Sequence, residues 1–445
     1  MIVPRNRLLF WVAAIVLPFA LLAAVVPASA TVSLLLIGAF FIVAIVDAIG
    51  GRQTLDGIGI ELPAIARMSK DREAKLELRI LNPQKQKRNL RVALDWPREV
   101  KPLDEEVDAI LPAGSEWSRL PLPCRPLKRG NYRLNSAFVE SGSPFGLWSV
   151  RKIVPLRSEI RVYPNLLTER KSLAALFLNR GTFGIHAQRQ IGKGRDFEKL
   201  REYVPGDGYD EIHWKATARR GRPITKVFQI EKTQEVYVIV DASRLTARKV
   251  ERDSENETTV LERFVTASLV LGLAAEQQGD LFGLLTFSNK VERFVRAKNG
   301  QAHYSACRDA LYTLQPKIVT PDFDELCTFI RLRLRRRALL VFLTALDDPA
   351  IAENFVRNID IIRRQHLVLV NMVRPPGIKP MFASPDVAEV DDLYRHLGGH
   401  LQWHNLRELQ KVLQRRAVRF SLLDNENLSH ELVSQYMTVK QRQLL

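Results

Sequence analysis

The stretch EVYVIVDAS, residues 235–243, decides the fold of the larger part of this chain. Residues 236–240 are all aliphatic or aromatic, and the stretch continues with a carboxylate at Asp241 and a hydroxyl at Ser243. A continuous apolar run of this length predicts a strand that is covered on both faces, which is typical of parallel sheets.

Runs of the same character recur further along the chain, as LFGLLTF (281–287), ALLVFLT (338–344) and HLVLVNMV (366–373). Segments with helical periodicity lie between them, at residues 259–278, 304–314, 323–334 and 351–364. Strand alternating with helix predicts an α/β domain with a mostly parallel, doubly wound sheet over residues 235–420. Ligands of such sheets bind at the carboxyl ends of the strands, which makes Asp241 and Ser243 candidate site residues.

Residues 52–165 have a different pattern. In AKLELRIL (74–81) and RVALDW (91–96) apolar and polar residues alternate, as in a strand with one face in water. Turn-forming segments separate further runs of this kind, at residues 116–122, 132–139, 147–154 and 159–163. Together they predict a small antiparallel β-sandwich.

The first 51 residues are strongly apolar. No charged side chain occurs from Leu8 to Val46, and PASAT (27–31) divides this run into two spans, residues 8–26 and 32–49. Arg5 and Arg7 precede the first span and Arg52 follows the second, so the positive-inside rule places residues 52–445 in the cytoplasm.

Two features of this region leave alternatives open. Ala28-Ser29-Ala30 resembles a signal-peptide cleavage site, although the apolar run is longer than a signal peptide needs and a second span follows it. Asp47 stands near the end of the second span, where we expect it to be solvated at the membrane surface rather than to act as a functional intramembrane carboxylate.

The chain is basic, with 66 Lys and Arg against 49 Asp and Glu and a net charge of +17, which favours an anionic partner. Within residues 166–234, DFEKLREYV (196–204) predicts a short helix, and Asp210 is placed to cap a second helix that ends at Gly221. We expect Trp214 and Ile212 to anchor this second helix against the protein.

A cluster of bases accompanies that second helix. It is either a solvated or internally paired face or a docking face for an acidic protein, with membrane phosphates and nucleic acid as weaker alternatives. The residues that we predict to bind a partner are Trp214, Lys215, Arg219, Arg220 and Arg222. A second basic run, RLRLRRR (331–337), either complements a helix dipole or contacts anionic lipid headgroups.

The strand end at Asp241 resembles the von Willebrand factor A-type domain, whose metal site uses the pattern D-x-S-x-S, a distant threonine and a later aspartate. Asp241 and Ser243 match the first two positions, and Thr320 is a plausible distant threonine. Leu245 and Ala345 stand where the third position and the aspartate are expected. The resemblance thus implies either a degenerate Mg²⁺ site or a sheet of the same type that holds no metal, and we expect no other cofactor.

Two longer segments resemble the bacterial domain-of-unknown-function family 58. They are GRDFEKLREYVPGDGYDEIHWKATARRG (194–221) and RGNYRLNSAFVESGSPFGLW (129–148), the latter followed by VYP (162–164). The resemblance extends over roughly residues 1–420. It implies two N-terminal spans in the bacterial inner membrane, a β-domain and a von Willebrand A-like half. It also implies association with MoxR-type AAA+ ATPases in assembly or maturation of complexes and in envelope stress.

We therefore expect a membrane-anchored, non-catalytic adaptor that recruits such an ATPase, and we do not expect nucleic acid as its partner. The alternative is a membrane-associated metal-dependent or cysteine hydrolase that uses His213 with Cys307 or Cys327, but the spacing of these residues does not support it. The chain lacks the glycine-rich phosphate loop of nucleotide hydrolases. The expected domains are a membrane hairpin (1–51), a β-sandwich (52–165), a connecting region (166–234), the α/β domain (235–420) and a helical tail (421–445).

Overall fold

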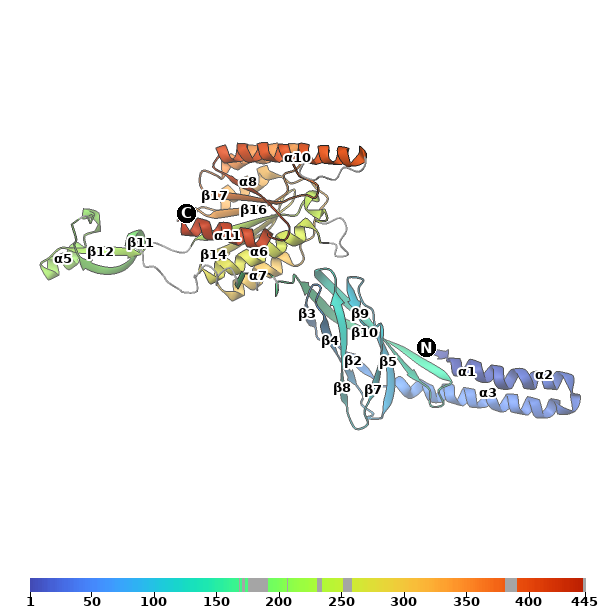
Figure 1. Cartoon of the computed structure of the whole chain (residues 1–445). Coiled ribbons are helices and arrows are strands. Elements are labelled where there is room, and N and C mark those ends of the chain that lie inside the picture. The colour runs from blue at the N-terminus through green and yellow to red at the C-terminus, as the bar shows by residue number, and fades with distance from the viewer. Residues whose placement is uncertain are drawn as a thin grey trace. The chain divides into compact units, whose positions relative to one another are not determined.

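The computed structural model describes residues 1–167, 169, 173–174, 191–205, 207–229, 234–250, 258–380 and 390–442. The chain divides into two compact units, Met1–Asn165 and Leu166–Leu445 (Figure 1). The first unit contains two apolar helices and a β-sandwich, and the second contains the α/β sheet.

The N-terminal helices form a hairpin. The first consists of α1 (Asn6–Trp11), a π-helical turn (Val12–Val16) and α2 (Leu17–Val25), and a short turn at Pro27–Ser29 leads into α3 (Ala30–Arg52). The segments Asn6–Val25 and Pro27–Leu55 are long and apolar enough to cross a membrane, by length and composition. Their bounds lie within a few residues of the two spans predicted from the sequence.

The sandwich has two sheets around one core. One sheet has the order β1-β10-β9-β5-β7 with β3 also paired to β10, and the other has the order β2-β4-β8-β6. The inward residues of β4, Leu76, Leu78 and Ile80, are at most 1% exposed, which confirms the predicted alternation. The strands are β1 (Ile2–Pro4), β2 (Gly59–Glu61), β3 (Ile65–Ser69), β4 (Ala74–Leu81), β5 (Arg88–Leu94), β6 (Val100–Pro102), β7 (Glu106–Leu111), β8 (Trp117–Pro126), β9 (Gly130–Gly142) and β10 (Trp148–Tyr163).

Three details of the sandwich differ from the prediction. β3 pairs parallel with β10, whereas the predicted sandwich was antiparallel throughout. The runs 147–154 and 159–163 form the single strand β10, whose register shifts between Pro155 and Ser158. The residues before the first helix form β1, which pairs antiparallel with the start of β10. No pattern in the sequence predicts β1, because three residues are too few to show a period.

The second unit is built on a six-stranded sheet with the order β15-β14-β13-β16-β17-β18, in which only the edge strand β15 is antiparallel to its neighbour. Its strands are β13 (Glu235–Asp241), β14 (Leu281–Phe287), β15 (Val291–Lys298), β16 (Leu339–Leu343), β17 (Leu367–Val373) and β18 (Arg419–Leu423). The four apolar runs predicted as buried strands are β13, β14, β16 and β17.

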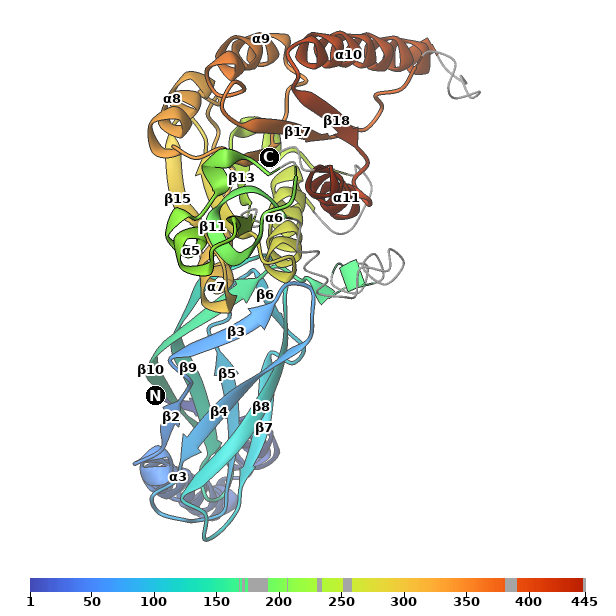
Figure 2. The same cartoon turned by 90° about the vertical axis from the view of Figure 1, so that its left-hand side faces the viewer.

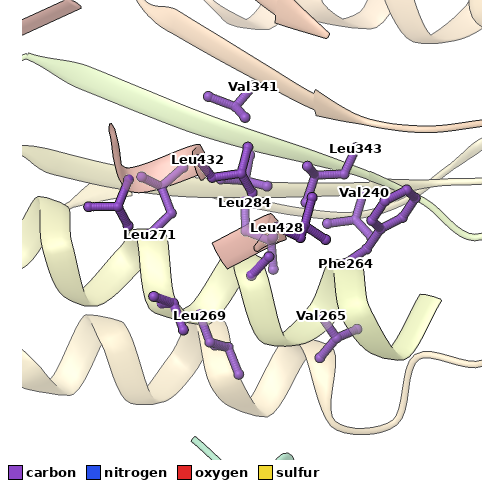
Figure 3. Packing of buried hydrophobic residues seen from close by; sticks show 14 of the residues in the cluster. Val240, Phe264, Val265, Leu269, Leu271, Leu284, Val341, Leu343, Leu428 and Leu432 are labelled. Carbon is purple, nitrogen blue, oxygen red and sulfur yellow. The ribbon is translucent and has the colours of Figure 1, made fainter. Parts of the chain in front are cut away.

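Helices cover both faces of this sheet (Figure 2). One face packs against α6 (Val260–Gln277), α7 (Gln301–Leu311) and α11 (Leu428–Gln441), and the other against α8 (Phe323–Arg333), α9 (Pro349–Asn358) and α10 (Val390–Arg415). Figure 3 shows the first of these cores, where Phe264 and Leu271 of α6 meet Val240, Leu284 and Val341 of the strands.

The predicted helical tail 421–445 is wrong as a separate domain. Its first residues belong to β18, which pairs parallel with β17. The following helix α11 places Leu428, Leu432 and Tyr436 in the core beside α6, each at most 1% exposed. This spacing of four residues makes one face of α11 apolar, and burial of that face joins the helix to the domain.

The connecting region contains a small element of its own. β11 (Ile191–Glu202) and β12 (Ile224–Gln229) form a two-stranded antiparallel sheet, and α5 (Trp214–Arg220) lies in the segment between them. The predicted helix over 196–204 is therefore wrong for residues 196–202, which pair with β12 instead. A short apolar run does not distinguish helix from strand, and here the pairing partner decides.

Candidate functional site

The carboxylate of Asp241 lies fully buried at the end of β13, at 0% exposure. Its Oδ1 accepts a hydrogen bond from the backbone N–H of Ser243 at 2.8 Å, and its Oδ2 accepts one from the Thr344 hydroxyl at 2.7 Å. Burial raises the pKa of Asp241, while the bonds from Thr344 and Ser243 oppose that rise. Thr344 follows β16, the neighbour of β13, and sequence reasoning did not single it out.

Ser243 is also fully buried, and its Oγ has no hydrogen-bond partner among the residues described. Thr320 is exposed on the loop that precedes α8. That loop lies beside Ser243, because Lys317 N donates to Ala242 O at 2.8 Å and Arg244 N donates to Val319 O at 3.0 Å. The structure thus brings together Asp241, Ser243 and the loop that carries Thr320.

The two aspartates that follow β16, Asp347 and Asp348, are paired with other residues and do not face this site as free ligands. Asp347 forms an ion pair with Arg248, and Asp348 lies 3.2 Å from the guanidinium of Arg244. Asp348 also caps α9, since its Oδ1 accepts from Ala350 N at 3.0 Å.

The oxygen set at this strand end is small. Asp241 and Ser243 offer a carboxylate and a hydroxyl, whereas a hard divalent ion takes about six oxygen ligands. No group of three His, Cys, Asp or Glu side chains suited to a metal occurs in the part of the chain that the structure describes. Mg²⁺ at Asp241, Ser243 and Thr320 stays a prediction.

The two cysteines considered for a hydrolase lie in the cores on opposite faces of the sheet. Cys307 and Cys327 are fully buried in α7 and α8, and burial raises the pKa of each thiol to about 12. Cys307 Sγ lies 3.6 Å from His303 Nε2, but this nitrogen also lies 2.8 Å from the carbonyl oxygen of Phe282. A carbonyl only accepts, so Nε2 carries the proton and is not a base for the thiol.

The remaining hydrolase candidate has a structural contact of its own. His213 is the N-cap of α5, and its Nδ1 accepts from Ala216 N at 3.0 Å. The prediction that Asp210 caps this helix is wrong, because Asp210 lies in a 3₁₀ turn (Tyr209–Glu211) and α5 begins only at Trp214. Gly221 ends the helix as predicted, with φ of +68°, a conformation that favours glycine.

A carboxylate shapes the turn that leads into α5. Asp207 accepts hydrogen bonds from the Arg201 guanidinium at 2.6 Å, from Val204 N at 3.1 Å and from the Thr225 hydroxyl at 3.1 Å. The bond from Val204 N contributes most to a lowered pKa for this carboxyl. Asp207 thus joins the turn to both strands of the small sheet.

Trp214 does not anchor the helix as predicted, because its side chain is 68% exposed. Ile212 is the residue that packs inward, at 7% exposure, and it forms a β-bridge with Thr225. The helix was predicted to begin three residues earlier than α5 does. In the structure Trp214 is the first residue of α5, and its side chain faces solvent. Tyr209, which sequence reasoning missed, is 79% exposed on the preceding turn.

The predicted bases lie on the same small element. All of them are exposed, and Arg222 pairs with Glu202 of β11 at 2.7 Å. An exposed pair of this kind contributes about 0–1 kcal/mol, so the cluster keeps its positive character. We call the following residues the signature face: Tyr209, Trp214, Lys215, Arg219, Arg220 and Arg222.

The model of the family described as "Protein of unknown function DUF58" matches residues 199–378. This part of the chain is similar to the DUF58 family. The match confirms the family predicted from the signature segment, over a shorter range than the predicted residues 1–420, and it includes both the signature face and the end of β13.

The curated relatives are uncharacterised. Uncharacterized protein Rv1480 of Mycobacterium tuberculosis (strain ATCC 25618 / H37Rv) is 25% identical over 213 residues, which are 46% of this chain and 62% of the relative. Uncharacterized protein Mb1516 of Mycobacterium bovis matches to the same extent. This chain therefore spans less than two thirds of the length of these relatives.

Two solved structures are similar at a low level. An aerotolerance-related membrane protein from Bacteroides fragilis NCTC 9343 is 14% identical, covering 45% of this chain and 97% of its own, with a TM-score of 0.27. The conserved hypothetical protein BatB from Bacteroides thetaiotaomicron is 14% identical, covering 47% of this chain and 99% of its own, with a TM-score of 0.27. Likeness at this level carries no conclusion about the function of this chain.

Proposed function

We propose that this protein is a membrane-anchored, non-catalytic adaptor that recruits a partner protein through the signature face. Trp214 and Tyr209 are exposed on the same small element as the exposed Arg219 and Arg220, and this exposure carries the proposal. Tyrosine, tryptophan and arginine are the residues that most often dominate the binding energy of protein interfaces. Exposed aromatic side chains on an element that also carries exposed arginines favour an acidic protein surface as the partner.

The resemblance to the family suggests a MoxR-type AAA+ ATPase as this partner. The adaptor supplies position and the ATPase supplies the energy of remodelling, which agrees with a chain that lacks a phosphate loop. The six-stranded sheet serves as a von Willebrand A-like scaffold, an assignment supported by its mostly parallel order and by Asp241 and Ser243 at the end of its central strand β13.

The proposed location is the bacterial inner membrane, with residues 52–445 in the cytoplasm. Two apolar helices of sufficient length support the anchor. Arg5, Arg7 and Arg52 at the ends of these helices support the orientation, because positive residues are retained on the cytoplasmic side.

Crosslinking in cells tests the adaptor. The full-length chain with charge reversal at Arg219→Glu, Arg220→Glu and Arg222→Glu is expected to capture an AAA+ ATPase about tenfold less, because attraction is replaced by repulsion. The matched control reverses three exposed bases of the sandwich, Lys75→Glu, Arg79→Glu and Arg119→Glu, and is expected to capture normally. Equal capture by both variants, or capture of no ATPase by the unaltered chain, would contradict the proposal.

A further inference from the structure

The turn between β9 and β10, residues 143–148, joins the sandwich to the second apolar helix. We call these residues the hairpin tip, meaning the tip of the β9–β10 hairpin and not the turn between the two apolar helices. The carboxylate of Asp47 in α3 is 1% exposed and accepts three hydrogen bonds from the tip. They come from the Ser143 hydroxyl at 2.5 Å, from Phe145 N at 2.8 Å and from Leu147 N at 3.1 Å. The expectation that Asp47 is solvated is therefore wrong.

Every backbone N–H of the hairpin tip has a hydrogen-bond acceptor within the protein. Asp47 serves two of these groups, and the other three are served inside the tip. Ser143 N donates to Trp148 O at 2.9 Å, Gly146 N donates to Ser143 O at 3.0 Å, and Trp148 N donates to Ser143 Oγ at 3.0 Å. Pro144 has no N–H to satisfy. A turn with no unpaired donor meets the main condition for leaving water, because an unpaired N–H costs several kcal/mol in hydrocarbon.

The hairpin tip also packs between the two apolar helices. Leu147 forms a small core with Leu8 of α1 and Ala44 of α3, and Trp148 packs against it. The indole N–H of Trp148 donates to the carbonyl of Ala44 at 2.8 Å. A Cβ built on Gly51 would lie 3.2 Å from Ser143 Cβ, so the helix and the tip approach closely there.

The position of Asp47 along α3 gives the depth of this contact. Asp47 lies 17 residues after Ala30, the first residue of α3, which is about 26 Å along the axis at about 1.5 Å per residue. The hydrocarbon core of a bilayer is about 30 Å thick. If the turn at Pro27–Ser29 reaches the far surface, Asp47 and the tip residues bonded to it lie just inside the near edge of the hydrocarbon.

The exposed part of the tip is apolar. Phe145 is 64% exposed, and the neighbouring Pro144 is exposed as well, whereas Ser143, Gly146 and Leu147 are buried. An exposed phenylalanine at this depth has lipid as its neighbour rather than water.

We propose that the hairpin tip is a third membrane-embedded element, which inserts the Phe145 side chain between phospholipid acyl chains at their boundary with the headgroups. The partner of this surface is the bilayer itself. The inference rests on the proposed insertion of the two apolar helices, and it adds that the sandwich enters the lipid with them. Asp47 makes this possible, because it satisfies the tip where water is scarce.

Fluorescence of the full-length chain in vesicles of phosphatidylcholine and phosphatidylglycerol tests the proposal. A nitrobenzoxadiazole probe is attached to Phe145→Cys, with Val43→Cys of α3 (47% exposed) as the membrane reference and Leu103→Cys (56% exposed) as the water reference. Leu103 follows β6, which lies at the end of this unit opposite α3 (Figure 2). The native cysteines are fully buried, and labelling of the unsubstituted chain gives the background.

The expected result is that iodide quenches the probe at position 145 about threefold less than the probe at 103, because ions are scarce in hydrocarbon. Brominated phospholipid is expected to quench positions 145 and 43 but not position 103. If iodide reaches the probe at 145 as easily as the probe at 103, the inference is overturned. If the probe at position 43 is still shielded in that case, the membrane anchor itself stands. Shielding of position 145 from both quenchers would overturn it too, because a protein surface would then cover Phe145. Exposure of Val43→Cys to iodide would refute the membrane anchor and the inference with it.

Discussion

Replacing Asp47 with alanine tests how strongly the hairpin tip depends on one carboxylate. The substitution removes the acceptor of Phe145 N, Leu147 N and the Ser143 hydroxyl. A buried donor left without an acceptor costs roughly 1–3 kcal/mol, so the two amides alone destabilise the closed tip by about 2–6 kcal/mol. The tip is therefore expected to open, since opening lets both amides reach water or detergent headgroups.

The lower end of that range already gives a measurable effect. A change of about 2 kcal/mol raises the open population about 30-fold, because 1.4 kcal/mol corresponds to a factor of ten. Hydrogen exchange followed by mass spectrometry on the full-length chain in detergent micelles reports this population through peptides that cover residues 143–148. Exchange in β4 and β8 is expected to stay unchanged, which shows that the sandwich remains folded.

Two further variants make this experiment specific. Asp47→Asn keeps one carbonyl oxygen as an acceptor and is expected to give an intermediate exchange rate. Asp108→Ala removes a carboxylate that is 75% exposed and paired with Arg91, and it is expected to leave the tip unchanged. If Asp47→Ala exchanges at the tip no faster than Asp108→Ala does, the carboxylate does not hold the tip closed.

Three other outcomes are expected from the α/β unit. His366 is 3% exposed, and burial lowers its pKa to about 4, so the unfolded state binds the proton more readily than the folded state does. The stability that this neutral histidine contributes is full above about pH 6.5 and falls by up to about 3 kcal/mol as the pH drops to 4. Urea unfolding at pH 7.5 and pH 5 should show this fall in the unaltered chain, and His366→Leu should lack it. Asp280 is fully buried and accepts hydrogen bonds from Lys440 Nζ at 2.8 Å and from the Tyr436 hydroxyl, both in α11. Asp280→Asn is expected to lose about 3 kcal/mol of unfolding free energy in the same assay. A loss of only about 0–1 kcal/mol, as for an exposed ion pair, would contradict a role of Asp280 in holding α11. Titration of the unaltered chain with Mg²⁺ is expected to produce little calorimetric heat, because the Asp241 carboxylate and the Ser243 hydroxyl alone would hold the ion weakly. Strong heat that disappears in Asp241→Asn would instead establish the metal site.

The elements that could be predicted from the sequence are those whose apolar pattern is long enough to indicate one type of secondary structure. Leu76, Leu78 and Ile80 alternate with charged residues over eight positions, and the strand β4 follows directly. The runs at β13 and β16 have no polar interior residue and are rich in β-branched or aliphatic side chains, as is typical of short strands covered on both faces. Their covering helices could then be predicted from periodicity between the strands.

The sequence failed where the environment of a residue comes from a distant part of the chain. Trp214 was expected inside and Asp47 outside, as the hydrophobicity of each side chain suggests. The Asp47 carboxylate is buried because its donors stand 96 to 100 residues further along the chain. The segment 196–202 is a strand because β12, which follows α5, pairs with it. No local pattern contains that information.

The strand-end carboxylates indicate which surface a partner protein can use. Asp241 is satisfied by Thr344 and Ser243, and Asp347 and Asp348 are paired with arginines of the same domain. A cation that bridged a partner to this edge would have to displace several of these internal contacts, at a cost of about 1 kcal/mol or more for each. Among the residues that the structure describes, the side chains of Trp214 and Tyr209 form no hydrogen bond or ion pair, and both are mostly exposed. Burial of Trp214 and Tyr209 by a partner therefore gains apolar burial at the expense of no more than the exposed Arg222–Glu202 pair, which favours the signature face over the strand end as the place where a partner docks.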